Sequence, residues 1–153
     1  MQTSASLELL ADAAGSVTFG WADDGVYYAR FSRSLSARLG ETFAARLSAA
    51  AASVDSLSCF ADARDLESYD LTARSAVLRV LEAQRVKLQR IEVLWWDGSA
   101  PSGSVRATIG ESLHVTLNAA EFEARLMACA PRARRRLGVK PDSPHRSRWP
   151  LRR

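Results

Sequence analysis

The stretch from Leu57 to Ser75 constrains the fold of this chain more than any other. It begins with an apolar run, Leu57 to Asp62, that is typical of a buried strand. It then passes through a predicted loop that holds four carboxylates, and it enters a helical pattern at Asp70. A strand that leads into a helix is half of a β-α-β unit, in which strands lie parallel to one another. Ligands and partners of such proteins bind where strands end and helices begin. We therefore expect the working surface at residues 62–74.

Upstream of this stretch the pattern predicts a hairpin and a helix. Residues 17–21 and 26–31 are rich in β-branched and aromatic residues, and Asp24-Gly25 between them is a strong turn signal. Apolar residues then recur four apart, which predicts a helix over 34–52 that Ser34 or Ser36 caps.

Downstream, helices and strands continue to alternate. Asp70 suits a helix N-cap, and the apolar face of that helix is predicted to continue through Leu81 to Leu88. The remaining predicted elements are a strand at 91–96, a short helix at 105–109, a strand at 113–117 and a helix that begins with a capping box at Asn118 and ends before Pro131. This order predicts an α/β fold with a single mixed sheet of about five strands: an N-terminal antiparallel hairpin, then parallel strands joined by right-handed helix crossovers.

The distribution of charge divides the chain. Residues 1–130 carry 12 Lys and Arg against 16 Asp and Glu, whereas residues 131–153 carry 9 against 1 and contain four of the five prolines. Such a basic, proline-rich segment buries too little apolar surface to offset the entropy of ordering it. We therefore predict a lead-in at 1–15, a folded domain at 16–130 and a disordered Arg/Pro-rich tail at 131–153. Neither a signal peptide nor a membrane span is indicated, so a cytoplasmic location is expected.

The element order, together with the segment from Arg64 to Thr72, resembles the STAS superfamily, especially the bacterial anti-sigma-factor antagonists and their SpoIIAA-like or STAS/SEC14-like relatives. The likeness covers about residues 16–130. In the antagonists an acidic-Asp-Leu segment follows a strand, which Asp65-Leu66 matches, and an Asp-Ser pair begins the next helix, where Asp70 matches the aspartate. The resemblance implies a non-catalytic regulatory module that binds a protein partner, such as an anti-sigma-factor-like or kinase-like regulator.

One position departs from the antagonists. Their phosphorylatable serine follows the matched aspartate, and this chain has Leu71 there, with Thr72 one residue later. A phosphate adds about two negative charges beside the binding surface, and leucine cannot carry one. The phosphoserine switch is therefore expected to be absent, as in the divergent relatives, although Thr72, Ser68 or Tyr69 could substitute for the serine.

We predict that the protein is not an enzyme and that it needs no cofactor and no metal. The sequence contains no Gly-rich phosphate loop, GxSxG elbow or HExxH motif. The predicted partner-binding residues are Arg64, Asp65, Tyr69, Asp70, Thr72 and Arg74, with the polar groups setting orientation and Tyr69 supplying contact area.

Three alternatives remain open from the sequence. The carboxylates Asp62, Asp65, Glu67 and Asp70 could form a metal or general-acid cluster. The SEC14-like kinship implies a small apolar ligand or lipid between the sheet and the helices. Finally, the arginines of the tail could bind nucleic acid, anionic lipid or an acidic partner, and the first of them are Arg132, Arg134, Arg135 and Arg136.

Overall fold

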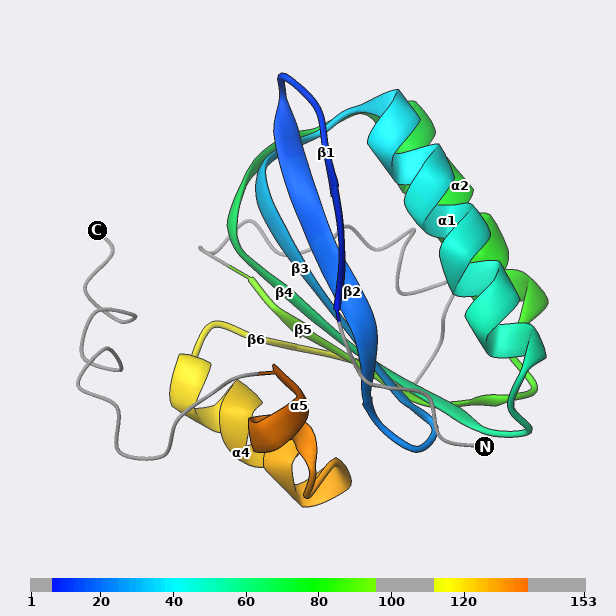
Figure 1. The fold of residues 1–153 in the computed structure, drawn as a ribbon, viewed down its shortest axis with the longest axis vertical. Coiled ribbons are helices and arrows are strands. Elements are labelled where there is room, and N and C mark those ends of the chain that lie inside the picture. The colour runs from blue at the N-terminus through cyan, green and yellow to red at the C-terminus, as the bar shows by residue number, and fades with distance from the viewer. Residues whose placement is uncertain (1–6, 96–111, 138–153) are drawn as a thin grey trace.

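The computed structural model describes residues 7–95 and 112–137, which form one mixed sheet with helices on both faces (Figure 1). The strands are β1 (Glu8–Ala11), β2 (Gly15–Asp23), β3 (Val26–Leu35), β4 (Leu57–Tyr69), β5 (Leu88–Leu94) and β6 (Leu113–Thr116). The helices are α1 (Ala37–Ala52), α2 (Leu71–Ala83), α4 (Ala119–Cys129) and α5 (Ala133–Leu137).

The six strands lie in the sheet in the order in which they occur in the sequence. Strands β1, β2 and β3 pair antiparallel, and β3, β4, β5 and β6 pair parallel. The predicted fold class, an antiparallel hairpin followed by parallel strands with helix crossovers, is confirmed. Gly25 has a φ of 73°, so the Asp24-Gly25 turn uses the left-handed conformation that glycine adopts without strain.

Several predicted boundaries move. The lead-in at 1–15 contains β1, whose edge pairing with β2 adds a sixth strand. Strand β3 extends to Leu35, so α1 begins after the Ser36 cap. Leu88, predicted on the inward face of a helix, is instead the first residue of β5 and is buried. The predicted short helix at 105–109 lies outside the described residues.

The two faces of the sheet are covered differently. Helices α1 and α2 lie side by side over one face, where the larger core includes Phe19, Phe43 and Leu57. Helices α4 and α5 cover the other face around Phe60 and Phe122 (Figure 1). On this second face a buried carboxylate ties α4 to β5, because Arg125 donates two hydrogen bonds of 2.9 Å to Glu92, which is 1% exposed.

The prediction of disorder is wrong for the beginning of the tail. Residues 133–137 form α5, and Ala133 is fully buried against the smaller core. The backbone N–H of Arg132 donates to Asp23 at 3.0 Å, and this bond fastens the segment to the end of β2. Residues 138–153 lie outside the described residues. Within the described part of the chain, no helix has the length and apolar character needed to cross a membrane.

Helices α1 and α2 touch at Gly40 and Ala73. A Cβ at position 40 would lie 2.2 Å from the Ala73 Cβ and 2.5 Å from the Ala73 Cα. Atoms cannot approach so closely, so the packing of the two helices requires glycine at position 40.

We expect Gly40→Ala to lower the free energy of unfolding by about 1–3 kcal/mol, because the added methyl group overpacks the contact with α2. Helix propensity alone predicts the opposite sign, since alanine favours a helix interior over glycine by about 1 kcal/mol. Urea denaturation measures the change, with Ala45→Gly on the exposed face of α1 as the control for propensity. A Gly40→Ala variant that is more stable than the unmutated protein would contradict the close contact between Gly40 and Ala73.

A hydrogen-bonded aspartate joins the β1–β2 turn to the start of α1. Asp12 Oδ1 accepts from the N–H groups of Ala14 and Gly15 at 2.8 and 3.1 Å, and Oδ2 accepts from Ser36 Oγ at 2.6 Å. Ser36 in turn caps α1 by accepting from the Leu39 N–H. The hydrogen bond from Ser36, followed by that from Ala14, lowers the pKa of Asp12 below 3.8.

Because the folded-state pKa is depressed, the stabilisation by Asp12 is fully present above pH 3.8 and is lost as the pH falls through the folded-state value. We expect Asp12→Asn to lower the urea midpoint at pH 7 and the difference from the unmutated protein to shrink below pH 3.8. Urea melts at a series of pH values measure this. A difference that does not change with pH would exclude an ionised Asp12 as the cause.

Candidate functional site

The site is built on β4, which has 13 residues and is the longest strand described. The acidic segment after Asp62 is not the predicted loop. It stays paired with β3 as far as the Leu35–Tyr69 pair, and two register shifts place extra residues on β4. The prediction of a loop at 62–69 is therefore wrong, while the predicted helix start after Asp70 is confirmed.

Two ion pairs explain why this acidic segment forms a strand. Arg64 donates to Asp62 through Nη2 at 2.7 Å and Nε at 3.2 Å, and their side chains are only 9% and 4% exposed. Arg30, on β3, donates to Asp65 at 2.9 Å. Burial opposes the charge of Arg30, but the hydrogen bond to Asp65 and the nearby charges of Asp62 and Asp65 together outweigh it, so the pKa of Arg30 is raised. Each of the two aspartates on β4 therefore has an arginine beside it that balances its charge.

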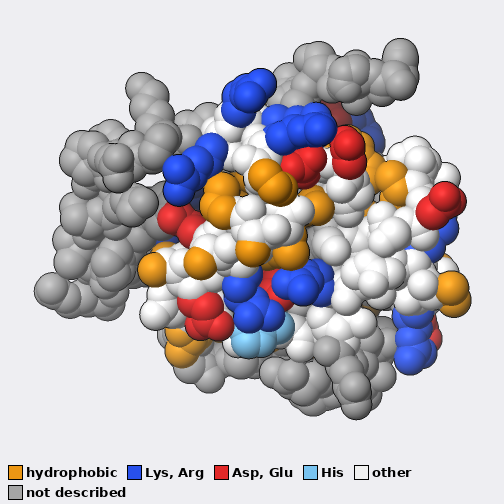
Figure 2. Space-filling model, turned by 90° about the horizontal axis from the view of Figure 1, so that it is seen from below, with side chains coloured by type: hydrophobic (Ala, Val, Ile, Leu, Met, Phe, Trp, Pro, Cys, Tyr) orange, Lys and Arg blue, Asp and Glu red, His pale blue; other side chains and the backbone are white. Residues whose placement is uncertain are grey.

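These pairs border a cavity of about 250 Å³ beneath α4, whose lining includes Tyr28, Glu123 and Leu126. Burial raises the pKa of Tyr28, so this phenol is neutral at physiological pH. Figure 2 views the molecule from below and shows basic side chains interspersed with acidic and apolar ones. Of the predicted tail arginines, Arg132, Arg134 and Arg135 are exposed and Arg136 is half-buried.

Beyond β4, the start of α2 presents apolar side chains to solvent. The Asp70 carboxylate caps the helix by accepting from the Thr72 N–H at 2.7 Å, as the sequence predicts. On either side of the cap, Tyr69 is 42% exposed and Leu71 is 68% exposed. Thr72 is exposed, and Arg74, one turn along α2, is half-buried.

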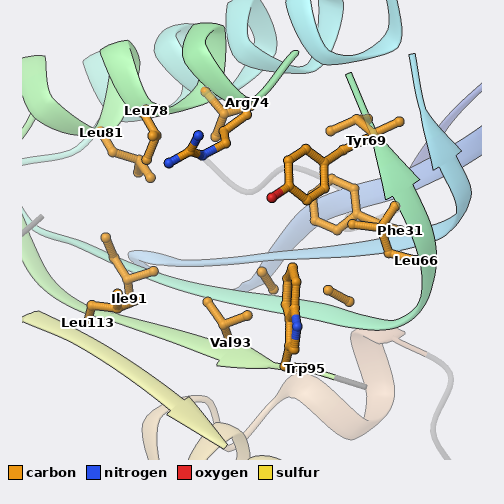
Figure 3. Close-up of a pocket in the computed structure, with 14 residues that line it drawn as sticks. Phe31, Leu66, Tyr69, Arg74, Leu78, Leu81, Ile91, Val93, Trp95 and Leu113 are labelled. Carbon is orange, nitrogen blue, oxygen red and sulfur yellow. The ribbon is translucent and has the colours of Figure 1, made fainter. Parts of the chain in front are cut away.

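Beneath this helix start lies an apolar pocket of about 180 Å³ between α2 and the sheet (Figure 3). Strand β5 pairs with β4 only as far as the Asp62–Leu94 pair, so the second half of β4 has no partner from β5. The pocket lies beside this half. Its lining is Phe31, Leu35, Ala61, Ala63, Leu66, Tyr69, Arg74, Val77, Leu78, Leu81, Ile91, Val93, Trp95 and Leu113.

The structure separates the six predicted contact residues into two groups. Tyr69, Asp70, Thr72 and Arg74 lie together at the start of α2, and Tyr69 and Arg74 also line the apolar pocket. Arg64 lines the cavity on the opposite face and is 8% exposed, and Asp65 pairs with Arg30, which lines the same cavity. Partner binding by any of the six stays a prediction.

The positions of the acidic side chains argue against a cluster of Asp62, Asp65, Glu67 and Asp70, because the three aspartates have separate partners. Asp62 is held by Arg64, Asp65 by Arg30, and Asp70 by the cap of α2. Glu67 is exposed near the end of β4. Among residues 7–95 and 112–137, no group of three or more His, Cys, Asp or Glu side chains is placed to hold a metal ion.

The sequence reasoning missed Leu71 and Trp95 as site residues. Leu71 was considered only as a residue that cannot be phosphorylated, and its apolar side chain is exposed. Trp95 is predicted as a strand residue, with one of Trp95 and Trp96 in the core and the other available as a partner anchor, but Trp95 follows the last residue of β5 and lines the pocket. The small residues Ala61 and Ala63 on β4 were an available signal, because small side chains in a buried strand leave room for another group.

Comparison of the whole fold with solved structures identifies its class. A crystal structure of an uncharacterised protein of the DUF3478 family from Shewanella loihica PV-4, described as having a SpoIIAA-like fold, aligns with a TM-score of 0.52 at 10% identity over 82% of this chain and 98% of that chain. This chain has a SpoIIAA-like fold. The anti-sigma-factor antagonist SpoIIAA in its unphosphorylated form aligns with a TM-score of 0.47 at 17% identity, over 80% of this chain and 98% of that chain. No protein-family model and no curated protein sequence matches the chain.

The SpoIIAA-like fold agrees with the STAS resemblance that the sequence predicts. At 10% identity the likeness concerns the fold, so the function has to be argued from the residues of this chain.

In the SpoIIAA-like fold of this chain, Asp62 is expected to be structural. We expect Asp62→Asn to lower the free energy of unfolding by about 3 kcal/mol, because it removes the carboxylate paired with a buried guanidinium. Glu67→Gln, an exposed carboxylate on the same strand, is the matched control and is expected to change stability by less than about 0.5 kcal/mol. Guanidinium denaturation measures the free energy of unfolding of the two variants. Equal losses of stability would contradict a structural role for Asp62.

Proposed function

We propose that the protein is a non-catalytic regulatory module that docks a protein partner on the start of α2. The observation that carries this proposal is the pair of large apolar side chains, Tyr69 and Leu71, that flank the Asp70 cap at 42% and 68% exposure. Tyrosine is among the residues that supply most of the binding energy at the centre of protein interfaces, and the exposed Leu71 beside it adds apolar surface that a partner can bury.

The polar residues around this pair define the partner. Glu67 and Asp70 are exposed and adjacent to Tyr69 in sequence, whereas Arg74 is half-buried and lines the pocket together with Tyr69. A complementary protein presents an apolar depression to Leu71 and Tyr69 and basic or N–H donor groups at its rim, because opposite charges across an interface set its orientation. Such contacts need neither a cofactor nor a chemical step.

The chemistry of the described residues supports a non-catalytic module. Burial raises the pKa of the Cys59 thiol to about 12, so this cysteine is not an active nucleophile at neutral pH. The side chain of Asp70 is occupied in capping α2. With Leu71 in the place of the antagonists' serine, we propose that docking operates without the phosphoserine switch.

The test replaces Leu71 with aspartate and leaves the cap intact. A partner captured from the host on the full chain is purified, and its affinity is then measured by calorimetry. We expect Leu71→Asp to weaken binding by about 30-fold or more, as for the central residue of an interface. Val86→Asp is the matched control, since Val86 is 98% exposed in the turn after α2, and it is expected to bind like the unmutated chain. Equal loss in both variants, or in neither, would contradict docking at the start of α2.

A second candidate function, binding of a small molecule, is favoured by the pocket of about 180 Å³ under α2. Its apolar lining and its position between a sheet and a helix are typical of small-molecule sites. Binding of nucleic acid or an acidic partner by the tail stays a prediction. Of its arginines, Arg132 also lies 3.7 Å from Asp23 and 3.5 Å from Asp24, which offsets part of its charge.

A further inference from the structure

We infer that the arginines at and around α5 form a docking surface for double-stranded DNA, which they bind through the phosphate backbone and without regard to base sequence. This arginine surface consists of Arg132, Arg134, Arg135 and Arg136. It lies on the opposite side of the sheet from α2, so it is separate from the proposed docking site of a protein partner, and its failure would leave that proposal intact.

The arginine surface is fixed to the folded domain. Ala133 is fully buried against the smaller core, and Ala130 before it is fully buried as well. The N–H of Ala133 donates to the Ala130 carbonyl at 2.9 Å, and the N–H of Arg132 donates to Asp23 at 3.0 Å. Figure 1 shows α5 beside α4, on the other side of the sheet from α1 and α2. Arginines held in place in this way lose less freedom on binding than arginines of a flexible chain, which favours affinity.

The short helix turns its small residue inward and its arginines outward. Ala133 is buried, whereas Arg132, Arg134 and Arg135 are exposed. Residues three or four apart on a helix surface lie about 5–6 Å from one another, as Arg132 and Arg135 do in sequence. A DNA duplex carries one negative charge per about 1.7 Å of its axis, so several phosphates lie within reach of a surface of this size.

Two of the arginines keep their full charge for a partner. Arg132 lies 3.7 Å from Asp23 and 3.5 Å from Asp24, which offset part of its charge. Within residues 7–95 and 112–137, no carboxylate lies within ion-pair distance of Arg134 or Arg135. In sequence, residues 138–153 add five basic residues against one acid, so this end of the chain attracts a polyanion before contact is made.

The chemistry of the surface favours phosphate groups and disfavours a membrane. A guanidinium pairs with a phosphate through two parallel hydrogen bonds, which a lysine cannot form. Stable association with a membrane combines basic side chains with apolar ones that insert among the lipids. Among the described residues, the exposed large apolar side chains all lie outside α4 and α5; they are Leu9, Tyr69, Leu71, Val86 and Leu117.

The same residues favour duplex DNA over other nucleic acids. Proteins bind single strands by stacking the bases on aromatic side chains, and no aromatic residue occurs at 130–137. Duplex RNA is recognised largely through its 2′-hydroxyl groups, for which residues 130–137 offer no hydroxyl or amide side chain. Contacts to the backbone alone carry no sequence information, so we expect binding that does not depend on the base sequence.

The experiment follows the fluorescence anisotropy of a labelled DNA duplex of mixed sequence during titration with the full chain. We expect a dissociation constant of about 1 µM or tighter at about 50 mM salt, and a linear fall of the logarithm of affinity with the logarithm of salt concentration. The single strand is expected to bind at least about threefold more weakly. Absence of binding at low salt, salt-independent affinity, or a single strand that binds as tightly as the duplex would overturn the inference.

Competitors separate DNA from other polyanions. Unlabelled duplex DNA, duplex RNA, polyglutamate and vesicles with about 30% phosphatidylserine are added at equal concentrations of charge. We expect the unlabelled DNA duplex to displace the labelled one most efficiently, and a second duplex of different sequence to compete within about threefold of it. More efficient displacement by RNA, polyglutamate or the vesicles would overturn the assignment to DNA.

A charge-matched pair of variants locates the contacts. We expect the double variant Arg134→Gln, Arg135→Gln to weaken duplex binding by about tenfold or more and to reduce the salt slope by about 2, because each phosphate contact contributes about 0.9. The control is Arg79→Gln, Arg85→Gln, which removes two exposed arginines on and just after α2 and leaves the same net charge. Equal losses of affinity in the two double variants would show that net charge alone attracts the duplex and would contradict a docking surface at α5.

Removal of an acid is expected to act in the opposite direction. Asp24 is exposed and offsets the charge of Arg132. We expect Asp24→Asn to tighten duplex binding by about two- to fivefold, since it releases Arg132 for a phosphate and asparagine before glycine suits the same turn. Glu82→Gln, which removes an exposed acid from α2, is the control and is expected to change affinity by less than about 1.5-fold. A gain in Asp24→Asn that does not exceed the gain in Glu82→Gln would contradict the role of Arg132.

Discussion

The unequal length of two neighbouring strands creates the apolar pocket under α2 and exposes the start of that helix. Strand β4 continues to Tyr69, but β5 pairs with it only as far as Asp62. Among residues 7–95 and 112–137, the rest of β4 pairs with β3 alone, and α2 crosses back over the space left beside it. The apolar pocket lies in that space, and the same geometry carries Tyr69 and the cap of α2 out to the surface. The pocket and the exposed helix start are thus two results of one constraint.

The second half of β4 can extend in this way because its charges are balanced on the opposite face. Asp62 and Arg64 neutralise each other while almost fully buried, and Asp65 pairs with Arg30 on the neighbouring strand. Without these pairs, burial of the charges would cost several kcal/mol for each ion. The face toward α2 can then be lined by Ala61, Ala63 and Leu66, since the alternation of side chains along a strand sends polar and apolar groups to opposite sides.

The elements predicted correctly from the sequence are those fixed by local chemistry. The Asp24-Gly25 turn and the caps at Ser36 and Asp70 depend on residues adjacent in the chain, so the pattern reveals them. The acidic part of β4 was not predictable in this way, because the arginine that neutralises Asp65 lies on β3. Strand β1 has four residues and depends on pairing with β2. The pocket depends on the relative ends of two strands, which no single segment encodes.

Tyr69 belongs to both surfaces, which links the two proposals physically. One side of its ring lines the pocket, while 42% of the residue faces solvent beside Leu71. A ligand bound in the pocket would contact the Tyr69 ring, restrict its orientation and therefore change the surface that a docking protein meets. Linkage requires the effect to be reciprocal, so a partner that favours one orientation of the ring changes the affinity for the ligand by the same factor.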